Sequence, residues 1–129
     1  MALTKNARTI VANTSNAAGA TTRGRLDMNA VQGPSLLTVK IVNGGTGPTL
    51  PCTAAVLVAH NATLPVVGPA GTDWKTFFPP VSPGTGASAT LESAYQIPPS
   101  VMCLEVEFTG NTGQAVTVEA YLSELTTIS

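Results

Sequence analysis

Residues 104–125, LEVEFTGNTGQAVTVEAYLSEL, contain the clearest structural pattern in the chain. Apolar residues stand at every second position in two runs, which are separated by the sequence Gly-Asn-Thr-Gly. An apolar residue at alternate positions is typical of a strand with one buried face. The apolar positions of the two runs are Leu104, Val106, Phe108, Val116, Val118, Ala120 and Leu122. This stretch therefore predicts two strands joined by a short loop.

We expect the two strands to pair as a β-hairpin. Because side chains alternate with a period of two, an odd number of loop residues keeps both apolar faces on the same side of one sheet. Residues 111–113 would meet this condition as a type I turn with Gly113 in the left-handed region. In this register Phe108 faces Val116.

The same register places Glu105 directly opposite Glu119 on the outer face of the hairpin. Like charges that face each other across a ladder are destabilising by up to about 1 kcal/mol. We therefore expect the pair to meet a cationic partner, and both residues are candidates for contacts between subunits. The alternative is that water solvates both carboxylates.

Composition indicates the fold class. The chain has 129 residues, of which 10% are charged, and it contains 12 Gly and 10 Pro. Short β-prone runs between Gly/Pro breaks predict an all-β, single-domain antiparallel β-sandwich of about seven or eight strands, with a jelly roll among the arrangements it allows. So few charges suggest that other protein chains cover much of the surface. A neutral free domain is the alternative.

Further strands are expected at 23–31, 37–41, 52–60, 73–78 and 89–97. Residues 52–60, CTAAVLVAH, are apolar at both parities, which predicts a central strand buried on both faces or lying at a subunit contact. The run 73–78 contains Trp74, Phe77 and Phe78 and should end at the two prolines that follow. These aromatic residues either pack on the core or form a contact surface.

Residues 1–19 are polar and small, and we expect them to form an N-terminal arm outside a domain of residues 20–129. The arm is expected to pair with a sheet edge, on a neighbouring subunit for example, or to stay mobile until assembly. We expect Arg8, Arg23 and Arg25 to make contacts between chains. The cations of 23–31 are also placed to meet the glutamates of the hairpin.

The distribution of charge excludes some partners. All six cations precede residue 76, whereas five of the seven acidic residues follow it. This asymmetry suits head-to-tail packing between copies. A sequence pI of about 5.6 with 5% aromatic residues does not suit nucleic-acid binding. No apolar run is long enough to span a membrane, and no signal-peptide pattern is present, so we expect cytoplasmic synthesis.

No residue pattern predicts catalysis, a metal or a cofactor. The single histidine, His60, is expected to be structural, and Cys52 and Cys103 lack metal-binding spacing. We expect both cysteines to be reduced and packed near strands, although the sequence leaves a single disulfide open. A carboxylate pair of Glu105 and Glu119 lacks the aromatic cleft of a glycosidase and the oxygen count of a calcium site. Enzymatic activity is therefore not expected.

Several phrases resemble small structural proteins of tailed bacteriophages. They are NARTIVANTSNAAGATTRGRLDMNAV at 6–31, LLTVKIVNGGTGPT at 36–49, PCTAAVLVAHN at 51–61, and the stretch 104–125. The resemblance covers most of the chain except the middle loops. It implies a virion part and carries over no catalytic residue.

The resemblance implies a capsid decoration (cement) protein, a β-sandwich that forms a homo-oligomer, with a trimer favoured, and binds the major capsid protein or other virion proteins. Neck, tail and fibre-associated proteins are alternatives within the same resemblance. A module that binds a host receptor or glycan is a further alternative, and it predicts an exposed Trp74 or Tyr95 beside amides in a cleft.

Overall fold

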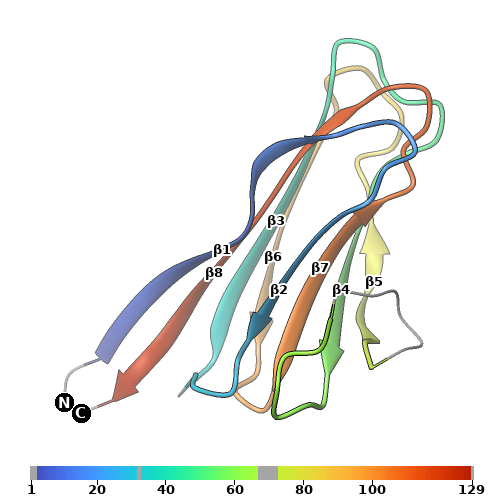
Figure 1. Ribbon diagram of the computed structural model, residues 1–129. Coiled ribbons are helices and arrows are strands. Elements are labelled where there is room, and N and C mark those ends of the chain that lie inside the picture. The colour runs from blue at the N-terminus through green and yellow to red at the C-terminus, as the bar shows by residue number, and fades with distance from the viewer. Residues whose placement is uncertain (1–2, 32, 67–72, 129) are drawn as a thin grey trace.

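The computed structural model describes residues 3–31, 33–66 and 73–128. In these residues eight antiparallel strands form two four-stranded sheets that face each other (Figure 1). The prediction of an all-β sandwich is confirmed. The strands are β1 (Leu3–Asn16), β2 (Thr22–Asp27), β3 (Ser35–Asn43), β4 (Thr53–Ala59), β5 (Lys75–Val81), β6 (Thr90–Ile97), β7 (Cys103–Thr109) and β8 (Val116–Ile128).

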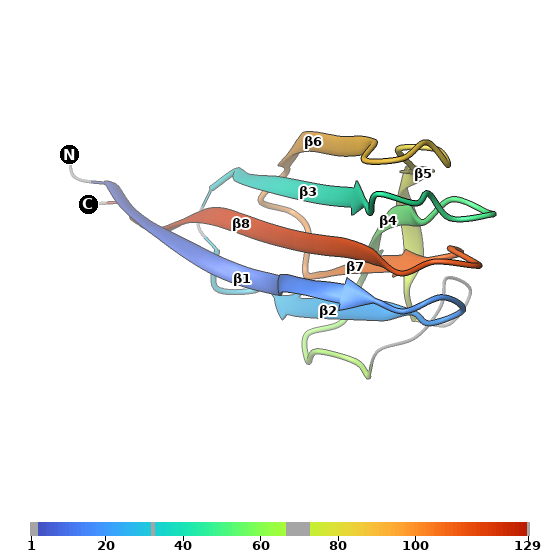
Figure 2. The same cartoon turned by 90° about the horizontal axis from the view of Figure 1, so that it is seen from above.

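The strand order is that of a jelly roll. The first sheet runs β1-β8-β3-β6 and the second runs β2-β7-β4-β5, so every connection except β4 to β5 crosses from one sheet to the other. Two such four-stranded sheets are the double-sheet arrangement that jelly rolls use. Figure 2, which shows the molecule from above, shows that β6 and β1 are the two edge strands of the first sheet.

The core lies between the sheets. Strand β3 alternates buried and more exposed residues along its whole length, as its apolar period predicts. The apolar faces of β7 and β8 are also buried, and they contribute Leu104, Val106, Phe108, Val116, Val118, Ala120 and Leu122 to one cluster. The sequence therefore predicted the inward faces of these strands correctly.

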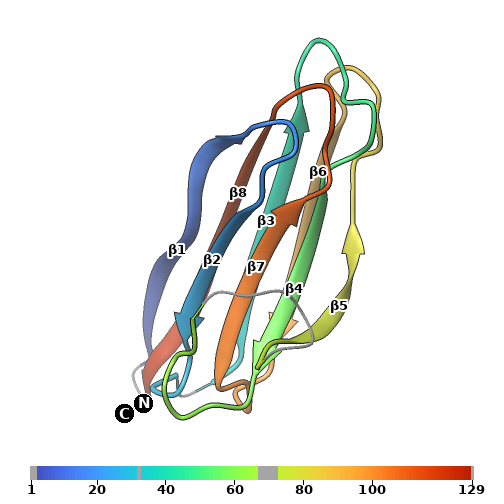
Figure 3. The same cartoon turned by 45° about the vertical axis from the view of Figure 1, so that its right-hand side comes forward.

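The predicted hairpin, by contrast, is wrong. Strand β7 pairs with β2 and β4, whereas β8 pairs with β1 and β3. Figure 3 shows β7 in the nearer sheet and β8 in the farther one. The two apolar faces meet across the core, where each buries the other, instead of lying side by side. Glu105 and Glu119 therefore belong to different sheets and do not face each other.

The connection from β7 to β8 explains how the chain changes sheets. Gly113 has φ 83°, so its predicted left-handed conformation is confirmed, and Gly110 has φ 103°. Between them Asn111 is fully buried. Its Nδ2 donates hydrogen bonds to the backbone oxygens of Asn16 (3.1 Å) and Gln114 (3.0 Å). These bonds tie the connection to the end of β1.

The segment predicted as an arm forms an edge strand of the chain's own sandwich. Strand β1 pairs along its length with β8, from Leu3 opposite Ile128 to Asn16 opposite Val116. Val11 is buried in the core. Residues 1–2 of the predicted arm lie outside the described residues.

Strand β4 is buried on both faces and lies between β7 and β5, as predicted. On its outer side Leu57 and Ala59 form a second small cluster with Trp74 and Cys103, against which Leu64 packs. Leu64 and Trp74, which follow β4 in the sequence, thus cover part of the outer face of this sheet. Both cysteines are free and buried, which confirms that prediction.

Strand β5 continues through Pro79 and Pro80 to Val81, although the prolines were expected to end it. Proline is tolerated in an edge strand, where its missing N–H faces away from the ladder. β5 pairs only with β4, and the pairing shifts register between Ala54 and Leu57. None of the described residues forms a helix that could cross a membrane.

Candidate functional site

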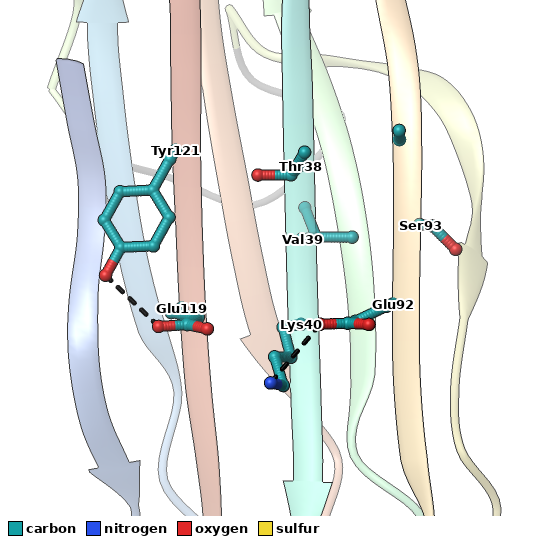
Figure 4. A pocket seen from close by; sticks show the side chains of 8 residues that line it. Thr38, Val39, Lys40, Glu92, Ser93, Glu119 and Tyr121 are labelled. Atoms are coloured by element: carbon teal, nitrogen blue, oxygen red, sulfur yellow. Dashed lines mark hydrogen bonds and ion pairs between the residues drawn. The ribbon is translucent and has the colours of Figure 1, made fainter. Parts of the chain in front are cut away.

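A groove of about 330 Å³ lies on the outer face of the first sheet. Outward side chains of β3, β6 and β8 form its floor and walls (Figure 4). Because neighbouring strands bring residues of distant sequence to the same level, the groove is a product of strand order. Its lining residues are Thr38, Val39, Lys40, Glu92, Ser93, Ala94, Glu119 and Tyr121.

Lys40 lies between two carboxylates. In the strand register it is opposite Glu92 of β6 on one side and Glu119 of β8 on the other. Its Nζ is 3.3 Å from Glu92 Oε1. Glu119 accepts hydrogen bonds from Tyr121 Oη (3.1 Å) and Asn13 Nδ2 (3.3 Å). The groove thus contains hydrogen-bond donors and acceptors at fixed positions.

Tyr121 is the aromatic residue of the groove. Its side chain is among the exposed large apolar ones, at 37%. In Figure 4 the ring turns a broad face outward, and the hydroxyl is held by Glu119. An aromatic face beside amide, amine and carboxylate groups can stack on a ring-shaped ligand and hydrogen-bond to its edge.

A second groove, of about 490 Å³, lies toward the other end of the same face. Leu36, which is 50% exposed, is part of it. Its lining residues are Lys5, Pro34, Ser35, Leu36, Gln96, Ser123, Glu124 and Leu125. Among the described residues, no group of three His, Cys, Asp or Glu side chains could hold a metal ion.

The predicted arginines are engaged within the chain. Arg23 Nε forms an ion pair of 2.9 Å with Glu107 Oε2, and the two residues face each other across β2 and β7. Arg25 lies opposite Glu105 in the same ladder and donates to the Pro65 backbone oxygen (2.8 Å). The cations of this strand thus meet glutamates of β7.

Arg8 reaches from β1 toward the second sheet. Its Nη1 lies 3.3 Å from Glu124 Oε2 and donates to the Asp27 backbone oxygen (3.0 Å). These contacts join β8 and the end of β2. That the three arginines also contact other chains stays a prediction.

The aromatic segment divides into buried and accessible residues. Trp74 is fully buried, and its Nε1 donates to the Val66 backbone oxygen (2.8 Å). Phe77 and Phe78 are half-buried, with Phe78 stacked on Tyr95 at a centroid distance of 4.5 Å. Packing on the chain's own interior thus accounts for Trp74, and only the two phenylalanines retain surface for an external contact.

The two glutamates first assigned to one hairpin lie in different environments. Glu105 is fully buried on the outer side of β7, between Arg25 of β2 and Leu57 of β4. Glu119 lies in the groove. His60 directly follows β4 and is exposed.

Sequence reasoning missed Lys40, Glu92 and Tyr121 as neighbours. Each was recognisable as an outward residue of a strand, but their meeting depends on β8, β3 and β6 being adjacent. An alternating pattern shows on which face of the sheet a residue lies, but it does not show which strand lies next to it.

Comparisons with known proteins find proteins of a similar fold but do not identify a family. No family model and no curated protein matches the chain. A chain in the structure of infectious bursal disease virus, Gx strain, is similar with a TM-score of 0.51 and 13% identity, over 95% of this chain and 32% of that one. This chain thus spans about a third of the viral chain's length.

Two other solved structures are similar to the chain with TM-scores below 0.5. A family 16 carbohydrate binding module-2 has a TM-score of 0.45 and 10% identity, over 84% of this chain and 71% of that one. The enzymatically active domain of bacteriophage CBA120 tailspike protein 4 has a TM-score of 0.44 and 10% identity, over 95% and 19%. Of these likenesses, the one with a TM-score of 0.51 shows that the chain shares its β-sandwich fold with a chain of a virus structure.

Proposed function

We propose that the chain is a non-enzymatic structural protein of a bacteriophage virion, and in particular a capsid decoration protein that stabilises the head lattice. The jelly-roll sandwich carries this proposal, because its fold is shared with a chain of a virus structure. The phrases that resemble tailed-phage structural proteins support it independently. A neck, tail or fibre-associated position is the alternative within the same role.

The mechanism is stabilisation by mass action. A protein that binds only the assembled lattice lowers the free energy of that lattice by its binding free energy. The effect grows when many copies bind one particle, and self-association of the copies adds avidity. Major capsid protein, or another virion protein, is the partner in this proposal.

A non-catalytic role agrees with the arrangement of acidic residues. Glu105 and Glu119, the carboxylate pair that was considered for glycosidase-type catalysis, belong to strands of different sheets. Glu105 is also fully buried. Neither residue can therefore act with the other on one substrate.

Virions prepared with and without the protein test the proposal. Cryo-electron microscopy should show jelly-roll density on the head lattice only when the protein is present. Particles without it should lose DNA at a lower temperature, and adding back the purified protein should restore their heat stability. Density confined to the tail would contradict the decoration role and leave the structural role intact, whereas absence from virions would contradict both.

A second candidate function is saccharide binding in the groove around Tyr121. The observation that favours it is the outward ring face, held by Glu119 next to Lys40, Glu92 and Asn13. Sugar rings present an apolar face for stacking and hydroxyl groups for paired donors and acceptors. The buried Trp74 does not serve this function, so the site differs from the one that the sequence suggested.

A glycan array followed by calorimetry tests saccharide binding. We expect Tyr121→Ala to abolish binding and Tyr121→Phe, which keeps the ring, to retain most of it. Equal binding by the parent and Tyr121→Ala, or no binding to any glycan, would contradict this function.

A further inference from the structure

The four sheet edges of the sandwich differ in how they are protected. An edge strand offers unpaired backbone groups that can pair with another chain unless bulges, prolines or covering elements prevent it. β1 has three register shifts along its pairing with β8. β5 has two register shifts and two prolines.

β2 is a short edge strand of six residues, and short edges offer little backbone for pairing. At Gly24 the backbone of Ile10 in β1 lies so close that a Cβ atom would overlap its carbonyl oxygen. β1 of the first sheet therefore packs against the inner face of β2 at this position. Register shifts or prolines thus interrupt the edges at β1 and β5, and the edge at β2 is only six residues long with a glycine inside it.

β6 is the exception. It pairs with β3 without a register shift from Ser35–Ile97 to Val42–Thr90, and its sequence, TLESAYQI, contains no proline, glycine or lysine. In Figure 2 no strand of the described residues lies beyond it. Its regular backbone therefore offers a template for one more strand.

The side chains along this edge also form an apolar seam. Leu91 and Tyr95 are half-buried and pack against the core. Phe78 of β5 stacks on Tyr95, and Phe77 lies 4.4 Å from Phe78 between ring centroids. A strand added to β6 would cover this seam as well as the backbone.

We infer that β6 is the surface by which two copies of this chain associate, antiparallel and around a two-fold axis at Ser93. Ile97 is fully buried in its own chain, so the pairing segment is residues 90–96, and Ser93 is its middle. The result is a continuous eight-stranded sheet across the dimer. The pairing is independent of the protein's place in a virion, and it gives a two-fold dimer where the phage resemblance favours a trimer.

The sequence of β6 is self-complementary in this register. Leu91 of one copy faces Tyr95 of the other, which is an aliphatic–aromatic pair of the kind that stabilises sheets. Glu92 faces Ala94, so no like charges are opposed, and Thr90 faces Gln96. Lys40 already pairs with Glu92 inside each copy at 3.3 Å.

Two substitutions at one exposed position test the pairing with opposite expected signs. Ala94→Glu would place a carboxylate opposite Glu92 twice in each dimer, whereas Ala94→Lys would place an ammonium there. Analytical ultracentrifugation should show the dimer dissociation constant rising for Ala94→Glu and falling for Ala94→Lys, each on the order of tenfold. Thermal unfolding of both variants checks that the monomer fold is unchanged.

Disulfide trapping tests the axis. Ser93→Cys should give a covalent dimer under mild oxidation, because directly opposed Cα atoms lie within disulfide range. Gln96→Cys is the matched control and should not form a covalent dimer, because in this register residue 96 of one copy faces residue 90 of the other and the two introduced cysteines lie far apart. A parent chain that is monomeric at high concentration, equal effects of the two Ala94 variants, or equal cross-linking by the two cysteine variants would overturn the inference.

Discussion

At the scale of single residues, two buried amides hold the ends of the sheets together. Asn16 Nδ2 donates to Asn111 Oδ1 (2.6 Å), and Asn16 Oδ1 accepts from Thr22 Oγ1 (2.6 Å). Both asparagines are almost fully buried. Since a buried polar group without a partner is costly, each amide depends on the other.

Asn111→Ala should destabilise the protein by roughly 2 to 4 kcal/mol, because it leaves buried backbone oxygens and Asn16 without their partner. Chemical denaturation monitored by the fluorescence of buried Trp74 measures the change. Gln114→Ala, at an exposed neighbouring position, is the control and should change stability by less than about 0.5 kcal/mol. Equal effects of the two substitutions would contradict the role of Asn111.

A second residue-scale prediction concerns pH. Burial raises the pKa of the Cys52 thiol from its ordinary value of 9.0 to about 11, so between these pH values the folded state keeps the proton that the unfolded state has lost. The stability from this thiol is complete below pH 9 and is lost as the pH rises toward 11.

We expect unfolding free energy to fall by about 1 kcal/mol more between pH 8 and pH 10 in the parent than in Cys52→Ala. Denaturant titrations of both proteins at the two pH values measure this difference. Identical pH slopes would show that the thiol has the same pKa in both states.

At the scale of elements, β1 of the first sheet lies very close to β2 of the second sheet at Gly24. A glycine is required at position 24 because there is no room for a side chain: a Cβ atom would overlap the Ile10 carbonyl. The backbone angle of this residue does not itself require glycine. The strand could not lie so close with any other residue at this position.

Gly24→Ala should therefore separate β1 from β2 and lower stability by roughly 2 to 4 kcal/mol. Gly45→Ala is the control, because no atom lies within 4 Å of its added Cβ. Thermal unfolding should show a large loss for the first variant and a change near zero for the second. A Gly24→Ala protein as stable as the parent would mean that the two strands can separate freely.

The whole molecule depends on β1 for the closure of its first sheet. Because Val11 is buried and β8 pairs with β1 over most of its length, removal of β1 would expose both the core and a long strand edge. We therefore expect the segment that was predicted as an arm to be required for the fold.

Deleting residues 2–19 should give a protein that aggregates or lacks a cooperative unfolding transition. Deleting residues 2–5, where the described side chains of Thr4 and Lys5 are exposed, should leave the transition in place. Circular dichroism with thermal scanning compares the two. A cooperative transition in the longer deletion would show that residues 2–19 are an independent arm.

The sequence predicted the interior of this molecule better than its connectivity. The strands at 37–41, 52–60 and 89–97 and the inward faces of β7 and β8 agree with the structure. The groove around Tyr121 was not predicted, because it combines three strands whose adjacency no local pattern gives.

The sequence by itself determined which side chains point inward, because a strand alternates its faces residue by residue and apolar residues avoid water. Only the tertiary structure decided which strands are neighbours. The alternating pattern of apolar residues on β7 and β8 is compatible with two arrangements. The strands could pair within one sheet, or they could lie in two sheets that face each other. Facing each other buries both apolar surfaces at once, and long-range pairing of β7 with β2 and β4 and of β8 with β1 and β3 satisfies their backbones.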